Sequence, residues 1–153
     1  MRDLARVQYG TRRPYAPAVA SLQGWTRAVL PATLRGAWLG IRVVDEAEGR
    51  RLNRDYRGKD GATNVLSFGA GGLPAGSGGF LGDLAICAPV VAREAREQGK
   101  DLRAHWAHMV VHGTLHLLGF DHERRADAAR MEAREREALA ALGFGDPYEA
   151  GRG

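Results

Sequence analysis

The stretch HGTLHLLGFDH, residues 112–122, decides how the C-terminal half of this chain folds. His112 and His116 are four residues apart, so a helix places both imidazoles on one face, one turn apart. Gly119 then ends that helix and lets the chain turn back towards His122. Because three imidazoles converge, the spacing predicts one metal ion bound by His112, His116 and His122, with a fourth position left for water.

The residue after His112 is Gly113, and this glycine bears on the substrate. Zinc peptidases of the metzincin type share the three-histidine spacing, but they have a glutamate here as the general base for peptide hydrolysis. Gly113 therefore argues against a peptidase. Three neutral imidazoles also leave the charge of a Zn²⁺ ion uncompensated, which favours an anionic substrate such as a phosphodiester. Nickel or copper could also bind such a site in vitro.

Two further histidines, His105 and His108, fall on the same helical stripe as His112 and His116. We interpret both as hydrogen-bonded residues of the core, because a single histidine on an apolar face usually has that role. His108 is also a candidate contact to substrate or to a ligand imidazole.

The segment YRGKDGATNVLSF, residues 56–68, is interpreted as a polar turn followed by a strand. Arg57 and Lys59 lie in that turn, and Arg57 is the better phosphate-binding candidate because its planar guanidinium can hold two phosphate oxygens. The alternative is an ordinary solvated turn. Asp83 and Asp121 could each orient a ligand imidazole or relay a proton, and spacing does not choose between them.

The hydrophobic pattern predicts alternating strands and helices, with the helices gathered in the C-terminal half. We expect an α+β fold with a mixed sheet of about four strands, packed with helices, in one domain spanning residues 1–153. The glycine-rich segment 69–79 is expected to be a mobile loop or flap. The predicted strands are residues 4–10, 36–44, 64–68 and 80–87, and the predicted helices 19–30, 45–54, 88–98, 102–118 and 126–142.

Composition is that of an ordinary globular protein, with 44% hydrophobic and 26% charged residues. The formal charge of +4 gives only a weak tendency towards anionic partners. The single cysteine, Cys87, cannot form an internal disulfide and is expected to be a small buried side chain in a protein of a reducing compartment. The first thirty residues contain no apolar stretch long enough for a signal peptide or membrane span, so we expect a cytoplasmic location.

These motifs resemble the YbeY family of bacterial endoribonucleases, also called rRNA maturation factors. The family motif H-G-x-L-H-L-x-G-[YF]-D-H matches residues 112–122, and the resemblance extends over most of the chain. Its other matching segments are IRVVDEAEGRRLNRDYRGKDGATNVLSF (41–68), LGDLAIC (81–87), EQGKDLRAHWAHMVV (97–111) and ALGFGDPY (141–148).

The resemblance implies a zincin-like fold with one Zn²⁺ ion on His112, His116 and His122 and with Arg57 in the active cleft. It implies a hydrolase acting on phosphodiester bonds: a single-strand-specific endoribonuclease in 3′-end maturation of small-subunit ribosomal RNA and in ribosome quality control. Its partners would be ribosomal RNA and the small ribosomal subunit, with ribosomal proteins or an assembly GTPase as further partners and no membrane.

Two alternatives remain open on the sequence. A zincin-type metallopeptidase is favoured by the histidine spacing and opposed by Gly113. A non-catalytic ribosome assembly factor would use the metal only to hold its fold.

Overall fold

The computed structural model describes residues 4–10, 16–34, 36–69, 79–120 and 124–149. Its strands are β1 (Ala5–Tyr9), β2 (Trp38–Val44), β3 (Val65–Gly69) and β4 (Phe80–Cys87). Its helices are α1 (Val19–Val29), α2 (Glu46–Arg57), α3 (Ala88–Gln98), α4 (Leu102–Leu117) and α5 (Arg125–Ala141), with a short 3₁₀ helix at Ala32–Leu34. None of these helices in the described ranges is long and apolar enough to cross a membrane.

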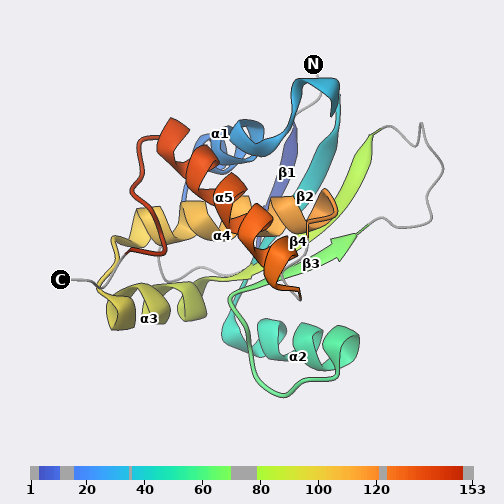
Figure 1. The fold of residues 1–153 in the computed structure, drawn as a ribbon. Helices are drawn as coiled ribbons and strands as arrows, with labels where there is room; N and C mark the ends of the chain where they lie inside the picture. The colour runs from blue at the N-terminus through green and yellow to red at the C-terminus, as the bar shows by residue number, and fades with distance from the viewer. Residues whose placement is uncertain (1–3, 11–15, 35, 70–78, 121–123, 150–153) are drawn as a thin grey trace.

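The four strands form one mixed sheet in the order β1-β2-β4-β3. Strands β1, β2 and β4 are parallel, whereas the edge strand β3 is antiparallel to β4. Helix α4 packs on one face of the sheet, against β3 and β4, and α1, α3 and α5 contact α4 (Figure 1). The predicted α+β fold with a mixed sheet is therefore confirmed.

The hydrophobic core lies between the sheet and the helices that cover this face. Leu39, Ile41 and Val43 alternate along β2 and are fully or almost fully buried. They belong to one cluster with residues of α1, α4 and α5. Burying a side chain of this size stabilises the fold by about 1.5–3 kcal/mol, so the cluster holds α4 firmly against the sheet. Its largest helical members include Leu22, Trp25, Trp106, Leu115, Met131 and Leu139.

Helix α2 begins as predicted and ends later than predicted. The Asp45 carboxylate accepts a hydrogen bond from the backbone N–H of Glu48 at 2.8 Å, which caps the first turn. The sequence predicted an end near Arg54, but the helix continues to Arg57 because Gly58 takes the left-handed conformation, with φ of 65°, that closes it. Arg57 is thus the last helical residue and not part of a turn.

Helix α4 ends just before Gly119, as the sequence predicted. Its N-terminus is capped by Asp101, whose carboxylate accepts from the Ala104 N–H at 3.1 Å. At the other end, Gly119 has φ of 99°, and the Phe120 N–H donates to the Leu115 carbonyl at 3.0 Å. This capping turns the chain sharply away from the helix axis.

Candidate metal centre

His112 and His116 lie on the last two turns of α4, and both are partly exposed. Their ring centroids are 4.7 Å apart and the rings are nearly perpendicular, at 80°. Both side chains line one cavity of about 580 Å³. The predicted pairing of these two imidazoles on one helical face is thus present in the structure. His122, the third predicted ligand, lies outside the described residues, as does Asp121.

Arg57 and Lys59 line the same cavity as the two histidines. Both side chains are exposed. Arg57 is the last residue of α2, and Lys59 lies in the turn after it. The shape of this turn is fixed by Asn53, a buried residue whose amide donates to the Gly61 carbonyl at 2.8 Å. The structure therefore brings the histidine pair and the cationic pair together, although Lys59 and His112 are 53 positions apart in the sequence.

Gly113 faces the sheet rather than the cavity, which explains why no glutamate stands beside His112. A Cβ atom at Gly113 would lie 2.8 Å from Leu84 Cδ2 and 3.1 Å from Val65 Cγ2. Contacts this short are repulsive in a packed interior. A longer side chain would also point into the core, where it could not act on a water in the cavity. The metallopeptidase alternative therefore has no position for its general base at this residue.

Behind His112, a buried carboxylate joins three side chains. Oε2 of Glu135, on α5, lies 2.6 Å from His108 Nε2 and 3.1 Å from His112 Nδ1. Its other oxygen, Oε1, accepts a hydrogen bond from the Tyr148 hydroxyl at 2.6 Å. Glu135 is only 1% exposed. We call these four residues the Glu135 network.

The Glu135 network holds an ionised carboxylate next to a neutral imidazole. Burial alone would raise the pKa of Glu135, but the hydrogen bonds from His108, His112 and Tyr148 outweigh it and lower that pKa to about 2. Burial also lowers the pKa of His108, so its ring is neutral at pH 7 and donates through Nε2–H. His108 Nδ1 has no hydrogen-bond partner among the described residues, which suits an unprotonated nitrogen. Burial and the Glu135 carboxylate together raise the pKa of Tyr148.

His108, His112 and Glu135 could themselves hold a metal ion, because each offers a ligand atom within 4.8 Å of the other two. Within this group, hydrogen bonds of 2.6 and 3.1 Å join the carboxylate to the two rings. Nitrogen ligands around a tetrahedral zinc ion lie about 3.3 Å apart, given bonds of about 2.0 Å. The 2.6 Å contact is shorter than that spacing and is better described as a hydrogen bond.

His105 is a hydrogen-bonded residue of the core, as predicted. It is 3% exposed, and its Nε2 lies 2.9 Å from Glu94 Oε1. The amide of Asn64 donates to the same carboxylate at 3.0 Å. His108 has the same kind of environment and adds the link to Glu135, so the interpretation of both residues is confirmed.

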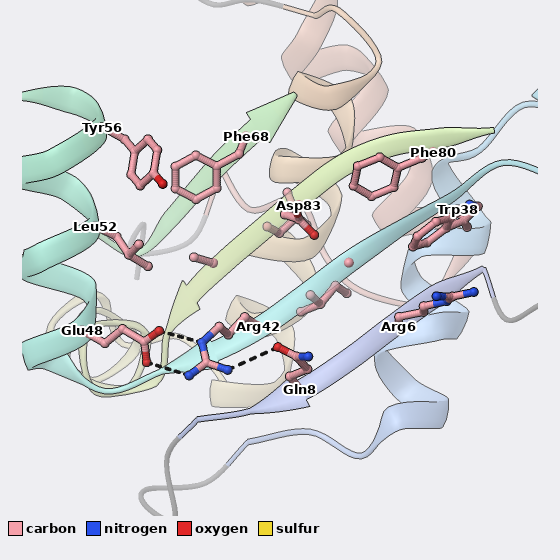
Figure 2. Close-up of a pocket in the computed structure, with 14 residues that line it drawn as sticks. Arg6, Gln8, Trp38, Arg42, Glu48, Leu52, Tyr56, Phe68, Phe80 and Asp83 are labelled. Carbon is pink, nitrogen blue, oxygen red and sulfur yellow. Dashed lines mark hydrogen bonds and ion pairs between the residues drawn. The ribbon is translucent and has the colours of Figure 1, made fainter. Parts of the chain in front are cut away.

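Asp83 lies on the opposite face of the sheet from the histidines. Its β4 neighbours Gly82 and Leu84 point towards α4, since a Cβ atom on Gly82 would lie 2.9 Å from Leu117 Cδ2. Strand residues alternate between the two faces, so Asp83 points away, into a groove of about 510 Å³ (Figure 2). Asp83 therefore does not orient the imidazole of His112 or of His116.

This groove on the far face shows no excess of either charge. The Arg6 guanidinium lies 4.3 Å from the Trp38 ring centre, and Asp83 lies in the middle of the groove (Figure 2). Arg42 is paired with Glu48 at 2.6 Å. Partial desolvation in the groove raises the pKa of the Asp83 carboxyl group, although the residue as a whole is exposed. Two arginines and two carboxylates thus balance, in contrast to the cavity that contains Arg57.

Glu135 and Tyr148 are the residues that reasoning from the sequence missed. A signal for Glu135 was present: Met131, Glu135, Ala138 and Leu139 occupy the buried face of α5. A carboxylate at a core position of an amphipathic helix needs buried partners. The histidine stripe on α4 was the available donor set, but only the contact between α4 and α5 identifies which histidines bind it.

Comparison with known proteins gives one consistent result. The model of the family described as Endoribonuclease YbeY matches residues 18–143. The Endoribonuclease YbeY of Halorhodospira halophila is 60% identical over 137 residues, which cover 88% of this chain and 89% of that protein. The protein of the same name from Stenotrophomonas maltophilia strain R551-3 is 57% identical over 150 residues, with 95% and 93% covered.

Among solved structures, the solution structure of TM1509 from Thermotoga maritima has the same fold. Its TM-score is 0.55 with 23% sequence identity, and the match covers 94% of this chain and 97% of the other.

Proposed function

This chain belongs to the Endoribonuclease YbeY family, and we propose that it cleaves single-stranded RNA with a zinc ion bound by His112, His116 and His122. We further propose that its substrate is the 3′ end of small-subunit ribosomal RNA. The enzyme is an endoribonuclease, a hydrolase of phosphodiester bonds, as its relatives are named.

The observation that carries this proposal is the shared cavity. His112 and His116 lie on one side of it, and Arg57 and Lys59 line it as well. An RNA phosphate in this cavity would therefore meet two imidazoles and two cationic side chains. Cationic donors at the place where charge develops are a main source of rate enhancement in phosphoryl chemistry.

The donor set fits zinc. Imidazole nitrogens are good zinc ligands, and the spacing of His112 and His116 lets one ion bind both rings. Nδ1 of His112 faces Glu135, so Nε2 is the nitrogen proposed to bind the ion. Zinc bound there would supply a Lewis acid that polarises a phosphoryl oxygen and acidifies water. His108 and Glu135 are hydrogen bonded to each other at 2.6 Å, so we propose that they support the ligands and do not bind the ion themselves.

Arg57 is proposed as the catalytic residue that holds the scissile phosphate. The planar guanidinium of an arginine can bind two phosphate oxygens at once. Because Arg57 is the last residue of α2, the helix and its Gly58 cap fix where the side chain begins. Lys59 adds a second positive charge that steers the RNA backbone towards the cavity.

The ribosomal substrate is supported by family membership rather than by geometry. We propose ribosomal RNA and the small ribosomal subunit as partners, in the cytoplasm, where that RNA is matured, with a role in ribosome quality control. Ribosomal proteins or an assembly GTPase would be further partners.

The test is RNA cleavage by purified, zinc-loaded protein from a nuclease-free preparation. We expect cleavage of an end-labelled single strand and little cleavage of its duplex. Arg57→Ala should lower the rate by about 100-fold or more, since removing one group that stabilises developing charge has that effect. Arg54→Ala is the matched control, because Arg54 lies one turn earlier on α2 and pairs with Asp55. Equal rates for wild type, Arg57→Ala and His116→Ala would refute the proposal.

A further inference from the structure

We propose that Glu135 is a positioning residue: it fixes the ring of His112 with the proton on Nδ1, so that Nε2 is directed to the metal. This inference rests on the proposed role of His112 as a ligand. Glu135 would contact a ligand of the metal and not the metal itself. His108 and Tyr148 are the two anchors that hold its carboxylate in place.

The hydrogen bond between Glu135 and His112 has a defined direction. Glu135 Oε2 lies 3.1 Å from Nδ1 of His112. An ionised carboxylate can only accept, so the hydrogen is on Nδ1. A neutral imidazole carries one proton, and Nε2 then has the lone pair. Metal-binding histidines commonly donate their second nitrogen to a carboxylate in this way, which sets both the tautomer and the ring orientation.

The Glu135 carboxylate is held rigidly by its surroundings. Glu135 is 1% exposed and both of its oxygens are hydrogen bonded. Tyr148 holds Oε1, whereas His108 shares Oε2 with His112. His108 and His112 are one turn apart on α4, so the carboxylate bridges α5 to two successive turns of α4. A carboxylate held on both sides cannot follow the ring if the ring turns, and it therefore resists that rotation.

A second contact between a carboxylate and a histidine of α4 provides the control for a purely structural role. Glu94 and His105 form a similar contact, at 2.9 Å between Glu94 Oε1 and His105 Nε2. His105 lies near the start of α4, away from the cavity that His112 and His116 line. A change at Glu94 thus removes a carboxylate from a histidine of α4 without touching the proposed ligands. This makes Glu94→Ala the matched control for Glu135→Ala.

The test measures zinc affinity by competition with a chromophoric chelator. We expect Glu135→Ala to weaken zinc binding by about 10- to 100-fold, the usual effect of removing such an outer partner. Glu135→Gln should restore most of the affinity, because its amide oxygen can still accept from His112. Glu94→Ala should bind zinc as the wild type does. Equal affinity of Glu135→Ala and wild type would overturn the proposal.

A second measurement needs no zinc and no activity. Nitrogen NMR of the metal-free protein should show His112 with its proton on Nδ1 in the wild type and in Glu94→Ala. In Glu135→Ala the proton should shift towards Nε2. If His112 keeps the Nδ1 proton in folded Glu135→Ala, Glu135 does not set the tautomer and the inference is wrong. Glu135→Leu, which has a similar volume and no hydrogen-bond acceptor, serves as the folded variant if the alanine variant unfolds.

The two proposals fail in different ways. If His116→Ala keeps full zinc affinity while Glu135→Ala and His108→Ala both abolish it, the ion is held by His108, His112 and Glu135. That result overturns the ligand set and makes Glu135 a ligand rather than a positioning residue. If His116→Ala abolishes binding and Glu135→Ala has no effect, the ligand set stands and only the role of Glu135 is refuted.

Discussion

The hydroxyl of Ser67 donates a hydrogen bond to the carbonyl oxygen of Gly113 at 3.2 Å, which ties the edge strand β3 to the helix that carries His112 and His116. Ser67 is also one of the residues that line the cavity. Strand and helix approach closely here because Gly113 has no side chain. The distance between the β3 side of the cavity and the two histidines therefore depends on this glycine.

Gly113→Ala is predicted to destabilise the protein. The added methyl group would lie 2.8 Å from Leu84 Cδ2, so either the leucine or the helix must move. Such overpacking costs about 1–3 kcal/mol. Urea unfolding followed by circular dichroism measures this loss in the free energy of unfolding.

Gly24→Ala is the control for that change. Gly24 also lies within a helix, α1, but a Cβ atom there would have no heavy atom within 4 Å. Alanine should stabilise the helix by about 0.5–1 kcal/mol at such a position. If both glycine substitutions shift stability in the same direction, the close packing of Gly113 is not what makes the glycine necessary.

His116→Ala is predicted to remove the bound metal. The two proposed ligands of α4 have ring centres 4.7 Å apart, and loss of one leaves too few ligands for tight binding. We expect about one zinc per chain in the wild type, by elemental analysis after dialysis against a weak chelator, and almost none in the variant. His105→Gln, on the same helix, should keep its zinc. Retention of the ion by His116→Ala would contradict the ligand set.

Glu94 should make stability depend on pH under acidic conditions. Burial alone would raise the pKa of Glu94, but hydrogen bonds from His105 and Asn64, with the charge of Lys100 nearby, lower it below its ordinary value of 4.5. Because the folded pKa is below the unfolded one, the ionised carboxylate stabilises the fold above about pH 4.5. This contribution is lost as the pH falls through the folded pKa.

The measurement compares wild type with Glu94→Gln. We expect the variant to be less stable at pH 7 and the difference in the free energy of unfolding to shrink towards pH 3. A difference that stays constant over this range would mean that Glu94 does not act through its charge.

Asp83→Asn should leave RNA cleavage almost unchanged. Asp83 lines the groove on the far face of the sheet and is separated from His112 by the sheet itself. An exposed substitution of this kind alters free energies by no more than about 0.5 kcal/mol, or roughly twofold in rate. The assay is cleavage of a short labelled single strand. A loss of cleavage rate comparable to that of Arg57→Ala would show that Asp83 takes part in catalysis.

Local signals in the sequence predicted most of the fold. Helices α2 and α4 begin close to where the sequence predicted, each capped by an aspartate, and Gly119 ends α4. The end of α2 was placed three residues too early, because Arg57 and its neighbours are polar and look like a turn. Only the left-handed Gly58 shows where the helix stops.

The site was predictable only in part, for a physical reason. His112 and His116 are four residues apart, and helical geometry alone brings them together. Arg57 meets them only because α2 and α4 border the same cavity. The direction of Asp83 depends on which face of the sheet α4 covers, and the strand is too uniformly apolar to reveal this. The partners of Glu135 depend in the same way on the contact between α4 and α5.

The hydrogen bond from Tyr148 to Glu135 has a practical consequence for handling the protein. Tyr148 lies beyond α5, in a segment without regular helix or strand, where a protease can cut more easily than within a helix. Loss of that segment would leave the sheet and its five helices intact. It would nevertheless remove one of the two anchors, His108 and Tyr148, that hold the carboxylate behind His112. A preparation trimmed before Tyr148 should therefore look folded by circular dichroism and still bind its metal less firmly.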